Sequence, residues 1–307
     1  MLKFIKNSII FILLGLVVGE AVTRVFKLTS EVPKRIVDIH GVQKYVPNQQ
    51  GHWKGGKHMW QINEYGWAGI APKSFDNLVT IIGDSFISNF MNPDVCHQGL
   101  ILKQLLPENN FFEVARPGVS FIEAMDFTKR LDSLHPKIQL VYINESDFSE
   151  SIIQLNRFSY MGQFDVETQK VIPGEMRSPK LKKILYNWKF MFYLYNRFPI
   201  SLPKLPNFSI EKDIVPVKIP VGPYEYYKSM LDYTVANYAI NNVVLIFKPE
   251  TDVKLVRLCA TYGFKTVHLD DSMDADWKFD YDFHWTCYGH NQVAKQVAQW
   301  VSDYLNN

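Results

Sequence analysis

The sequence predicts an α/β protein, a three-layer α/β/α domain around a mostly parallel sheet, preceded by an N-terminal membrane helix. Apolar runs rich in β-branched residues, such as residues 78–82 and 138–143, alternate along the chain with segments of helical periodicity. Strands without polar alternation are typical of parallel sheets that helices cover on both faces. A further apolar run at residues 9–19, behind Lys3 and Lys6, predicts the membrane helix.

Composition limits the class of protein. The chain has 307 residues, 47% of them hydrophobic and 21% charged, which is ordinary for a globular domain. A net charge of +2 gives no support for a nucleic-acid partner, which would favour a basic surface. Cys96, Cys259 and Cys287 are widely spaced and form neither a Cys-x-x-Cys pair nor a zinc pattern. We therefore expect no metal, and the odd number of cysteines predicts stability from packing without a disulfide.

The N-terminal apolar run can be interpreted in two main ways. It is shorter than the ~20 residues that span a bilayer, which fits a cleaved signal peptide with Gly19 and Ala21 as cleavage positions. Alternatively, a helix runs from about residue 5 to 26, and Glu20 and Arg24 pair one turn apart near the far interface. We favour this uncleaved anchor over the cleaved signal, and both over a buried helix of a soluble protein. Lysines before the run place the rest of the chain outside the cytoplasm, in the periplasm or at the cell surface.

The chain divides into three parts. Residues 1–27 form the signal anchor or transmembrane helix, residues 28–76 a stalk and entry segment, and residues 77–307 the α/β domain. A helical insertion is predicted at about 149–220, where apolar stretches alternate with prolines. This insertion either covers the entrance of the active site or is an ordinary surface segment. The predicted strands are 78–82, 111–115, 138–143, 242–247 and 264–269, and the predicted helices are 98–106, 121–134, 224–240, 252–262 and 289–305.

Ser85 is the candidate nucleophile. It follows the strand at 78–82 in the tripeptide Gly83-Asp84-Ser85, so its hydroxyl projects from the carboxyl edge of the sheet, where sites of such sheets form. Backbone N–H groups after the strand can donate to a developing oxyanion. Gly118, which follows the strand at 111–115, offers a second N–H at the same edge. The tripeptide alone carries little weight, because it also occurs in plain turns.

The C-terminal segment supplies a base for this serine. Asp282 and His284 lie two residues apart, between the last strand and the last helix, so both can reach the same strand ends. A carboxylate would orient the imidazole and stabilise its protonated form, as in a Ser-His-Asp triad. Asp280 is an alternative carboxylate. His290 is interpreted as a packing residue at the start of the last helix.

These motifs, in this order and spacing, make the chain resemble SGNH (GDSL-type) hydrolases over roughly residues 60–305. It looks most like their bacterial membrane-anchored branch, in which a helix ending in Glu and Arg precedes an Asn-x-x-Gly segment. The resemblance implies a flavodoxin-like SGNH fold in which Ser85, His284 and Asp282 are the catalytic residues. The matching residues are Glu20, Arg24, Asn63, Gly66, Gly83, Asp84, Ser85, Gly118, Asp282, His284, Trp285, Gly289 and His290.

One block departs from the family pattern. SGNH hydrolases usually carry Gly-x-Asn-Asp after the third strand, where the Asn side chain completes the oxyanion hole, but Ser146 precedes Asp147 here. The N–H groups of Ser85 and Gly118 would still contribute. Either the Ser146 hydroxyl replaces the missing donor, or Asn144 reaches in from a shifted turn. Because losing one such donor lowers turnover by ~10²–10³-fold, the departure affects the expected turnover more than the resemblance to the family.

The resemblance implies acyl transfer through a covalent ester on Ser85, with no metal or organic cofactor. The acceptor is water for an esterase, or a sugar hydroxyl for an O-acyltransferase. The expected substrate is a small acyl ester, such as acetyl, of cell-surface or cell-wall carbohydrate. Transfer would need a membrane acyl-donor protein as a partner. The alternatives are a non-catalytic relative that binds glycan or joins a membrane complex, and a lipid esterase, suggested by the aromatic residues at 188–198.

Overall fold

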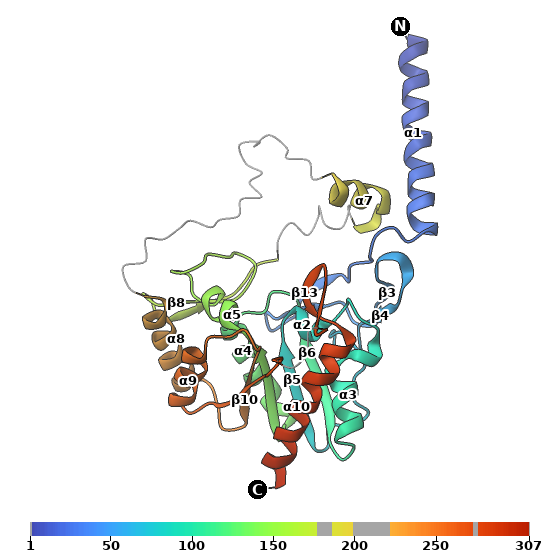
Figure 1. Ribbon diagram of the computed structural model, residues 1–307. Helices are drawn as coiled ribbons and strands as arrows, with labels where there is room; N and C mark the ends of the chain where they lie inside the picture. The colour runs from blue at the N-terminus through green and yellow to red at the C-terminus, as the bar shows by residue number, and fades with distance from the viewer. Residues whose placement is uncertain (1, 177–185, 199–221, 273–275, 307) are drawn as a thin grey trace.

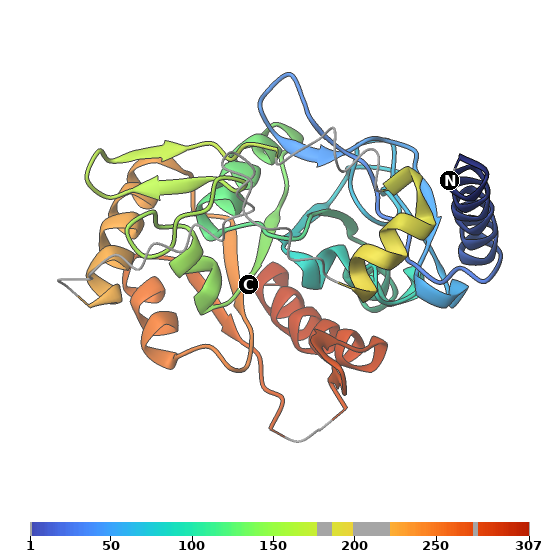
Figure 2. The same ribbon diagram turned by 90° about the horizontal axis from the view of Figure 1, so that it is seen from above.

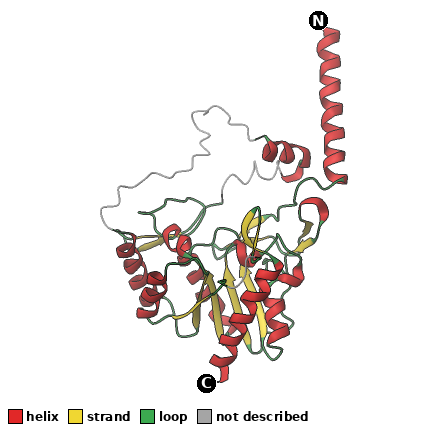
Figure 3. Ribbon diagram, in the orientation of Figure 1, coloured by secondary structure: helices red, strands yellow, loops and turns green. Residues whose placement is uncertain are grey.

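A five-stranded parallel sheet forms the centre of the protein (Figures 1 and 3). The computed structural model describes residues 2–176, 186–198, 222–272 and 276–306. The strand order β11-β10-β7-β5-β6 corresponds to the flavodoxin-like doubly wound order, which confirms the predicted fold class. The strands are β5 (Leu78–Gly83), β6 (Asn110–Ala115), β7 (Ile138–Ile143), β10 (Val243–Phe247) and β11 (Lys265–His268).

Helices cover both faces of this sheet and so complete the three layers. Every residue of β5, β7 and β10 is buried, because these continuous apolar runs must be covered on two sides. One hydrophobic core joins the sheet to α4, α8 and α9, and a second core joins its other face to α3 and α10. The helices are α3 (Gln98–Leu105), α4 (Phe121–Leu131), α8 (Pro223–Asn237), α9 (Val253–Thr261) and α10 (Cys287–Asn306).

Residues 28–76 wrap the domain. They form two antiparallel hairpins, β1 (Arg35–Val37) with β2 (Gln43–Tyr45), and β3 (Gln50–His52) with β4 (Met59–Gln61). Between the second pair, a Cβ added at Gly51 would lie 2.2 Å from the Trp60 ring, so only glycine allows this close approach. A small core then packs this segment onto Phe90 of the domain, through Tyr45, Trp60, Ile62 and Ala68.

The segment predicted as a helical insertion is only partly helical. After α5 (Glu145–Glu150), the strands β8 (Gln163–Asp165) and β9 (Lys170–Ile172) pair in a hairpin. Phe164 packs this hairpin against the domain, since its side chain is fully buried and its ring centroid lies 4.9 Å from that of Tyr233 on α8. The helix α7 (Lys189–Arg197) follows, while residues 177–185 and 199–221 of the predicted insertion lie outside the described residues.

The N-terminal segment is one continuous helix, α1 (Leu2–Val25), which extends away from the domain in Figure 1. Its residues Lys3–Val25 are long and apolar enough to cross a membrane, and few of them are buried against the protein. The predicted pairing of Glu20 with Arg24 is present, with Nε of Arg24 donating to Glu20 at 2.7 Å.

A disulfide joins Cys96 to Cys287, with their Cα atoms 5.1 Å apart, so the prediction of stability from packing alone is wrong. The two residues are 191 positions apart in the sequence. The start of α10 packs against the short 3₁₀ helix at Asp94–Cys96, and this contact between distant segments brings the thiols together. The odd number of cysteines is explained by Cys259, which stays free and buried.

Candidate functional site

Ser85 begins the short helix α2 (Ser85–Ser88) directly after β5. Asp84 caps this helix, and its carboxylate accepts a hydrogen bond from the Phe86 N–H at 2.9 Å. The cap makes the chain turn sharply at the end of the strand, which leaves Ser85 partly exposed at the carboxyl edge of the sheet. This is the position that a nucleophilic hydroxyl needs.

His284 and Asp282 reach Ser85 from a different element, β13 (Asp282–Trp285), which pairs with β12 (Lys278–Phe279) in a hairpin. The Nε2 atom of His284 lies 2.8 Å from the Ser85 hydroxyl oxygen. Its Nδ1 atom contacts the Asp282 carboxylate, which also accepts the His284 backbone N–H at 2.9 Å. The structure thus brings together the serine, imidazole and carboxylate that the sequence singled out, and the exposed Asp280 is not the carboxylate that contacts His284.

The surroundings favour ionised Asp282 and neutral His290. Although burial opposes it, the hydrogen bonds from the His284 ring and backbone lower the pKa of Asp282 below its usual value. His290 is buried in α10 and hydrogen-bonds Gln98, as expected for a packing residue. Burial first, and then the nearby charges of His97 and His284, lower the pKa of His290 to about 3. At this pKa, His290 is neutral near pH 7.

Aromatic rings fix the plane of the imidazole. The ring centroids of Phe86 and Phe283 lie 4.7 Å and 4.6 Å from that of His284. Phe86 in turn packs edge-on against the fully buried Trp285, with centroids 4.9 Å apart. Because the rings restrict rotation of His284, its Nε2 atom stays directed at Ser85.

The proposed oxyanion donors follow neighbouring strands. β5 lies between β6 and β7, so the chain segments after these three strands meet at one edge of the sheet, as predicted. Gly118, after β6, has φ of +75°, a backbone conformation that favours glycine. Asn144, after β7, is the N-cap of α5, and Ser146 lies in the first turn of that helix.

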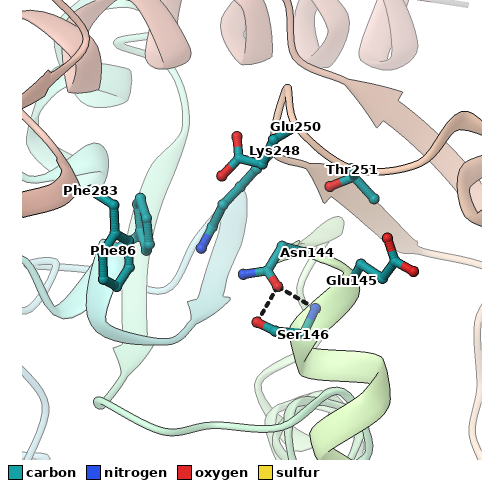
Figure 4. Close-up of a pocket in the computed structure, with 8 residues that line it drawn as sticks. All are labelled: Phe86, Asn144, Glu145, Ser146, Lys248, Glu250, Thr251 and Phe283. Carbon is teal, nitrogen blue, oxygen red and sulfur yellow. Dashed lines mark hydrogen bonds between the residues drawn. The ribbon is translucent and has the colours of Figure 1, made fainter.

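A cavity of about 260 Å³ opens beside the triad (Figure 4). Two aromatic rings contribute to its wall, and the remaining side chains are polar or charged. Among them, the Thr251 hydroxyl is buried and has no hydrogen-bond partner within the described parts of the chain. The lining residues are Phe86, Asn144, Glu145, Ser146, Lys248, Glu250, Thr251 and Phe283.

Hydrogen bonds within α5 orient Asn144 and Ser146 differently. The Oδ1 atom of Asn144 accepts the Ser146 N–H at 2.6 Å and also accepts the Ser146 hydroxyl. With its oxygen held by the helix, the Asn144 amide nitrogen points into the cavity, toward Lys248 (Figure 4). The Ser146 proton is already donated to Asn144. These contacts favour Asn144 over Ser146 as the side-chain donor to an oxyanion.

Substitution of Asn144 should therefore separate the two candidates. Asn144→Asp keeps an oxygen that can cap α5 but removes the N–H donor, and we expect turnover to fall by about 10²–10³-fold with little change in KM. The measurement is steady-state hydrolysis of a short activated ester. Ser146→Ala is the matched control and should have a mild effect. The reverse ranking would assign the donor to Ser146.

A buried cation contacts the two residues next to the nucleophile in the sequence. Lys248 directly follows β10 and is 1% exposed. Its Nζ atom lies 3.5 Å from the Asp84 carboxylate and 3.2 Å from the centroid of the Phe86 ring. Lys248 thus contacts the two residues that flank Ser85. Through this ion pair, Lys248 compensates the charge of Asp84. Nearby, burial and the charge of Asp84 raise the pKa of Asp147 well above its usual value.

We expect Lys248 and Asp84 to be energetically coupled. Lys248→Met and Asp84→Asn should each lower the free energy of unfolding, because each leaves one charge buried without its partner. The double variant should lose less than the two single losses combined, with a coupling of about 0.5–3 kcal/mol. Urea unfolding of the four proteins gives this coupling. Lys278→Met is the control. The Lys278 Nζ atom lies 3.4 Å from the Glu250 carboxylate in an exposed ion pair, so this change should lower the free energy of unfolding by less than about 1 kcal/mol.

Sequence reasoning missed Lys248 and Thr251. A usable signal was present, because Lys248 directly follows a fully apolar strand and therefore stands at the same sheet edge as Ser85. A lysine in that position is unlike the exposed lysines of loops. Thr251 gives no such signal, since its burial depends on how the loop after β10 packs.

No protein-family model matches the chain, and no curated protein matches it. Among solved structures, the chain is similar to a lipolytic protein of the G-D-S-L family from Desulfitobacterium hafniense DCB-2 (10% identity, 73% of this chain, 98% of that chain, TM-score 0.38). It is also similar to the psychrotrophic esterase EstA from Pseudoalteromonas sp. (10% identity, 76% and 100% covered, TM-score 0.38). A family two carbohydrate esterase from Clostridium thermocellum is similar at 11% identity, with 80% and 67% covered and a TM-score of 0.39.

Proposed function

We propose that the protein is an SGNH/GDSL-type serine esterase or O-acyltransferase with Ser85, His284 and Asp282 as its triad. The observation that carries the proposal is the 2.8 Å contact between His284 Nε2 and the Ser85 hydroxyl, with Asp282 bound to the opposite ring nitrogen. This arrangement can deprotonate a serine and hold the resulting imidazolium. The ionised state of Asp282, favoured by its lowered pKa, suits that role.

The reaction proceeds in two acyl transfers. Ser85 Oγ attacks the ester carbonyl carbon while His284 Nε2 takes its proton, and the carbonyl oxygen becomes an oxyanion. The N–H groups of Ser85 and Gly118, together with the Asn144 amide, stabilise that charge. His284 then returns the proton to the leaving alkoxide as the ester bond breaks, and the acyl group stays on Ser85. Water or a sugar hydroxyl then attacks the carbonyl carbon of this acyl group, and His284 takes the proton of the attacking group. His284 returns the proton to Ser85 Oγ as the bond to Ser85 breaks, which releases the free acid or the new ester.

The cavity supports a small polar substrate. Its volume of about 260 Å³ lies just below the ~300–1,000 Å³ of pockets that hold drug-sized ligands, which favours a small substrate. Glu145, Glu250 and Thr251 offer acceptors and a free hydroxyl beside two aromatic rings, and this combination suits the hydroxyl groups and apolar faces of a sugar. We therefore favour acetyl esters of cell-surface or cell-wall carbohydrate over lipid esters.

Two features support a location outside the cytoplasm. Lys3 and Lys6 lie at the start of α1, before its long apolar stretch, which favours a cytoplasmic N-terminus and an exported domain. The disulfide between Cys96 and Cys287 is typical of proteins in oxidising compartments such as the periplasm. We propose that α1 anchors the domain to the membrane and that the domain acts in the periplasm or at the cell surface.

Hydrolysis of acetylated carbohydrate tests the proposed function. The full-length protein should release acetate from acetylated sugars and cleave short activated esters faster than long ones. A serine-directed phosphonate should block both reactions and modify Ser85. Faster cleavage of long acyl esters would indicate a lipid esterase. If no ester acylates Ser85 and the protein still binds glycan, the non-catalytic alternative replaces the proposed enzyme.

A further inference from the structure

The helix α7 has an unusual environment for its composition. It contains Phe190, Met191, Phe192, Tyr193, Leu194 and Tyr195, yet none of its residues is buried. At its two ends, Trp188 is 52% exposed and Phe198 is 62% exposed. Within α7, residues 190–194 are half-buried and Tyr195 is 46% exposed, so the described part of the chain covers these apolar side chains only in part and leaves the rest of their surface facing outward.

Specific contacts dock α7 onto the membrane helix α1. The two Glu20 carboxylate oxygens accept the backbone N–H groups of Lys189 and Phe190, at 3.2 Å and 2.8 Å, and so cap the first turn of α7. Arg24 holds the same carboxylate and donates to the Asn187 carbonyl at 2.8 Å. One acidic side chain of α1 therefore provides the hydrogen bonds that the start of α7 lacks.

Packing reinforces this docking. A Cβ added at Gly19 would lie 2.6 Å from the Phe190 ring, so the glycine lets the ring rest directly against the backbone of α1. Figure 1 shows α7 beside the end of α1 nearest the domain, and Figure 2, where α1 is seen end-on, shows α7 lying across its direction. An α1 that crosses a membrane would place α7 parallel to the membrane plane.

The length of α1 gives the depth of α7. At about 1.5 Å per residue, the distance from Lys3 to Arg24 is ~32 Å, close to the ~30 Å thickness of the hydrocarbon layer. Lys3 and Arg24 would then lie at opposite interfaces. Glu20, one turn before Arg24, places the start of α7 at the outer interface, where tryptophan and tyrosine are enriched in membrane proteins.

We propose that α7 lies in the membrane–water interface, with the exposed rings of Trp188, Tyr195 and Phe198 on and beside the helix among the lipids. This inference rests on the proposed membrane location of α1 and deepens it. We expect the bilayer itself to cover the exposed face of α7, because the contacts of Gly19, Glu20 and Arg24 hold α7 against the membrane helix α1. Figure 1 shows α2 and β13, which carry the triad, at the end of the domain nearest α7, so the active site would work close to the membrane surface.

Spin labels on the full-length protein in lipid bilayers test this placement. Tyr195→Cys on α7 and Val253→Cys on α9 are a matched pair, since both side chains are 46% exposed. The native cysteines do not compete, because Cys96 and Cys287 are bonded and Cys259 is buried. The label at 195 should collide more often with oxygen, which concentrates in lipid, than with a water-soluble nickel complex. The label at 253 should show the opposite order.

A third label separates failure of the inference from failure of the anchor. Phe11→Cys, in the middle of α1 and 73% exposed, should report the lipid interior. If the label at 11 reports lipid but that at 195 reports water, the inference is wrong and the anchor stands. If both report water, the membrane location itself is wrong. Coupling between labels at 195 of two molecules would instead place a second copy on α7, which also overturns the inference.

Discussion

Ser85→Ala and His284→Ala should each abolish ester hydrolysis almost completely, by about 10⁶-fold in turnover. The reason is that the serine is a nucleophile only when the imidazole, 2.8 Å away, takes its proton. The double variant should be little worse than either single variant, because members of a triad act as a unit. Asp282→Asn should also be severe, at about 10⁴-fold, since His284 would lose the carboxylate that sets its tautomer.

Two controls make this result specific to the triad. Asp280→Asn alters an exposed carboxylate two residues from Asp282 and should leave turnover nearly unchanged. Circular dichroism and thermal unfolding should show that Ser85→Ala is folded. Rate losses from Ser85→Ala and His284→Ala that multiply in the double variant would contradict the triad, because they would show two independent contributions.

Removal of the disulfide should have the largest effect on stability. Replacing both Cys96 and Cys287 by alanine opens a crosslink between positions 191 apart, for which the chain-entropy account gives about 5 kcal/mol. The crosslink also ties Cys287, three residues after His284, to the 3₁₀ helix at Asp94–Cys96, so it restrains the position of His284. We therefore expect a lower unfolding free energy in urea and a reduced turnover. Both should be measured on the full-length protein.

A reducing agent provides the internal control for the disulfide. Reduction should destabilise the wild type to about the level of the double variant and should leave the double variant unchanged. Equal urea midpoints for the oxidised and reduced wild-type protein would show that Cys96 and Cys287 are not bonded in solution. That result would also remove one of the two supports for a location outside the cytoplasm.

The sequence by itself determined the order of the sheet strands and of the helices that cover the sheet, because that information is local. The strands at 138–143 and 78–82 are apolar runs whose burial follows from their composition, and the structure places them within one residue of the predicted ends. The positions of Ser85, His284 and Asp282 followed from residue types at the ends of predicted strands and from the family resemblance. Their catalytic roles stay predictions for the experiments above.

Only the tertiary structure decided contacts between segments that are distant in the chain. Pairing of Cys96 with Cys287 depends on how α10 packs, and no count of cysteines contains that information. The same holds for Lys248, whose burial against Asp84 results from the adjacent positions of β10, β7 and β5. The orientation of Asn144 was also undecided in the sequence, because it depends on hydrogen-bond directions at the start of α5. The spacing of residues along the chain predicts which side chains are close together only within one helix or strand, whereas a functional site is assembled from several helices, strands and loops.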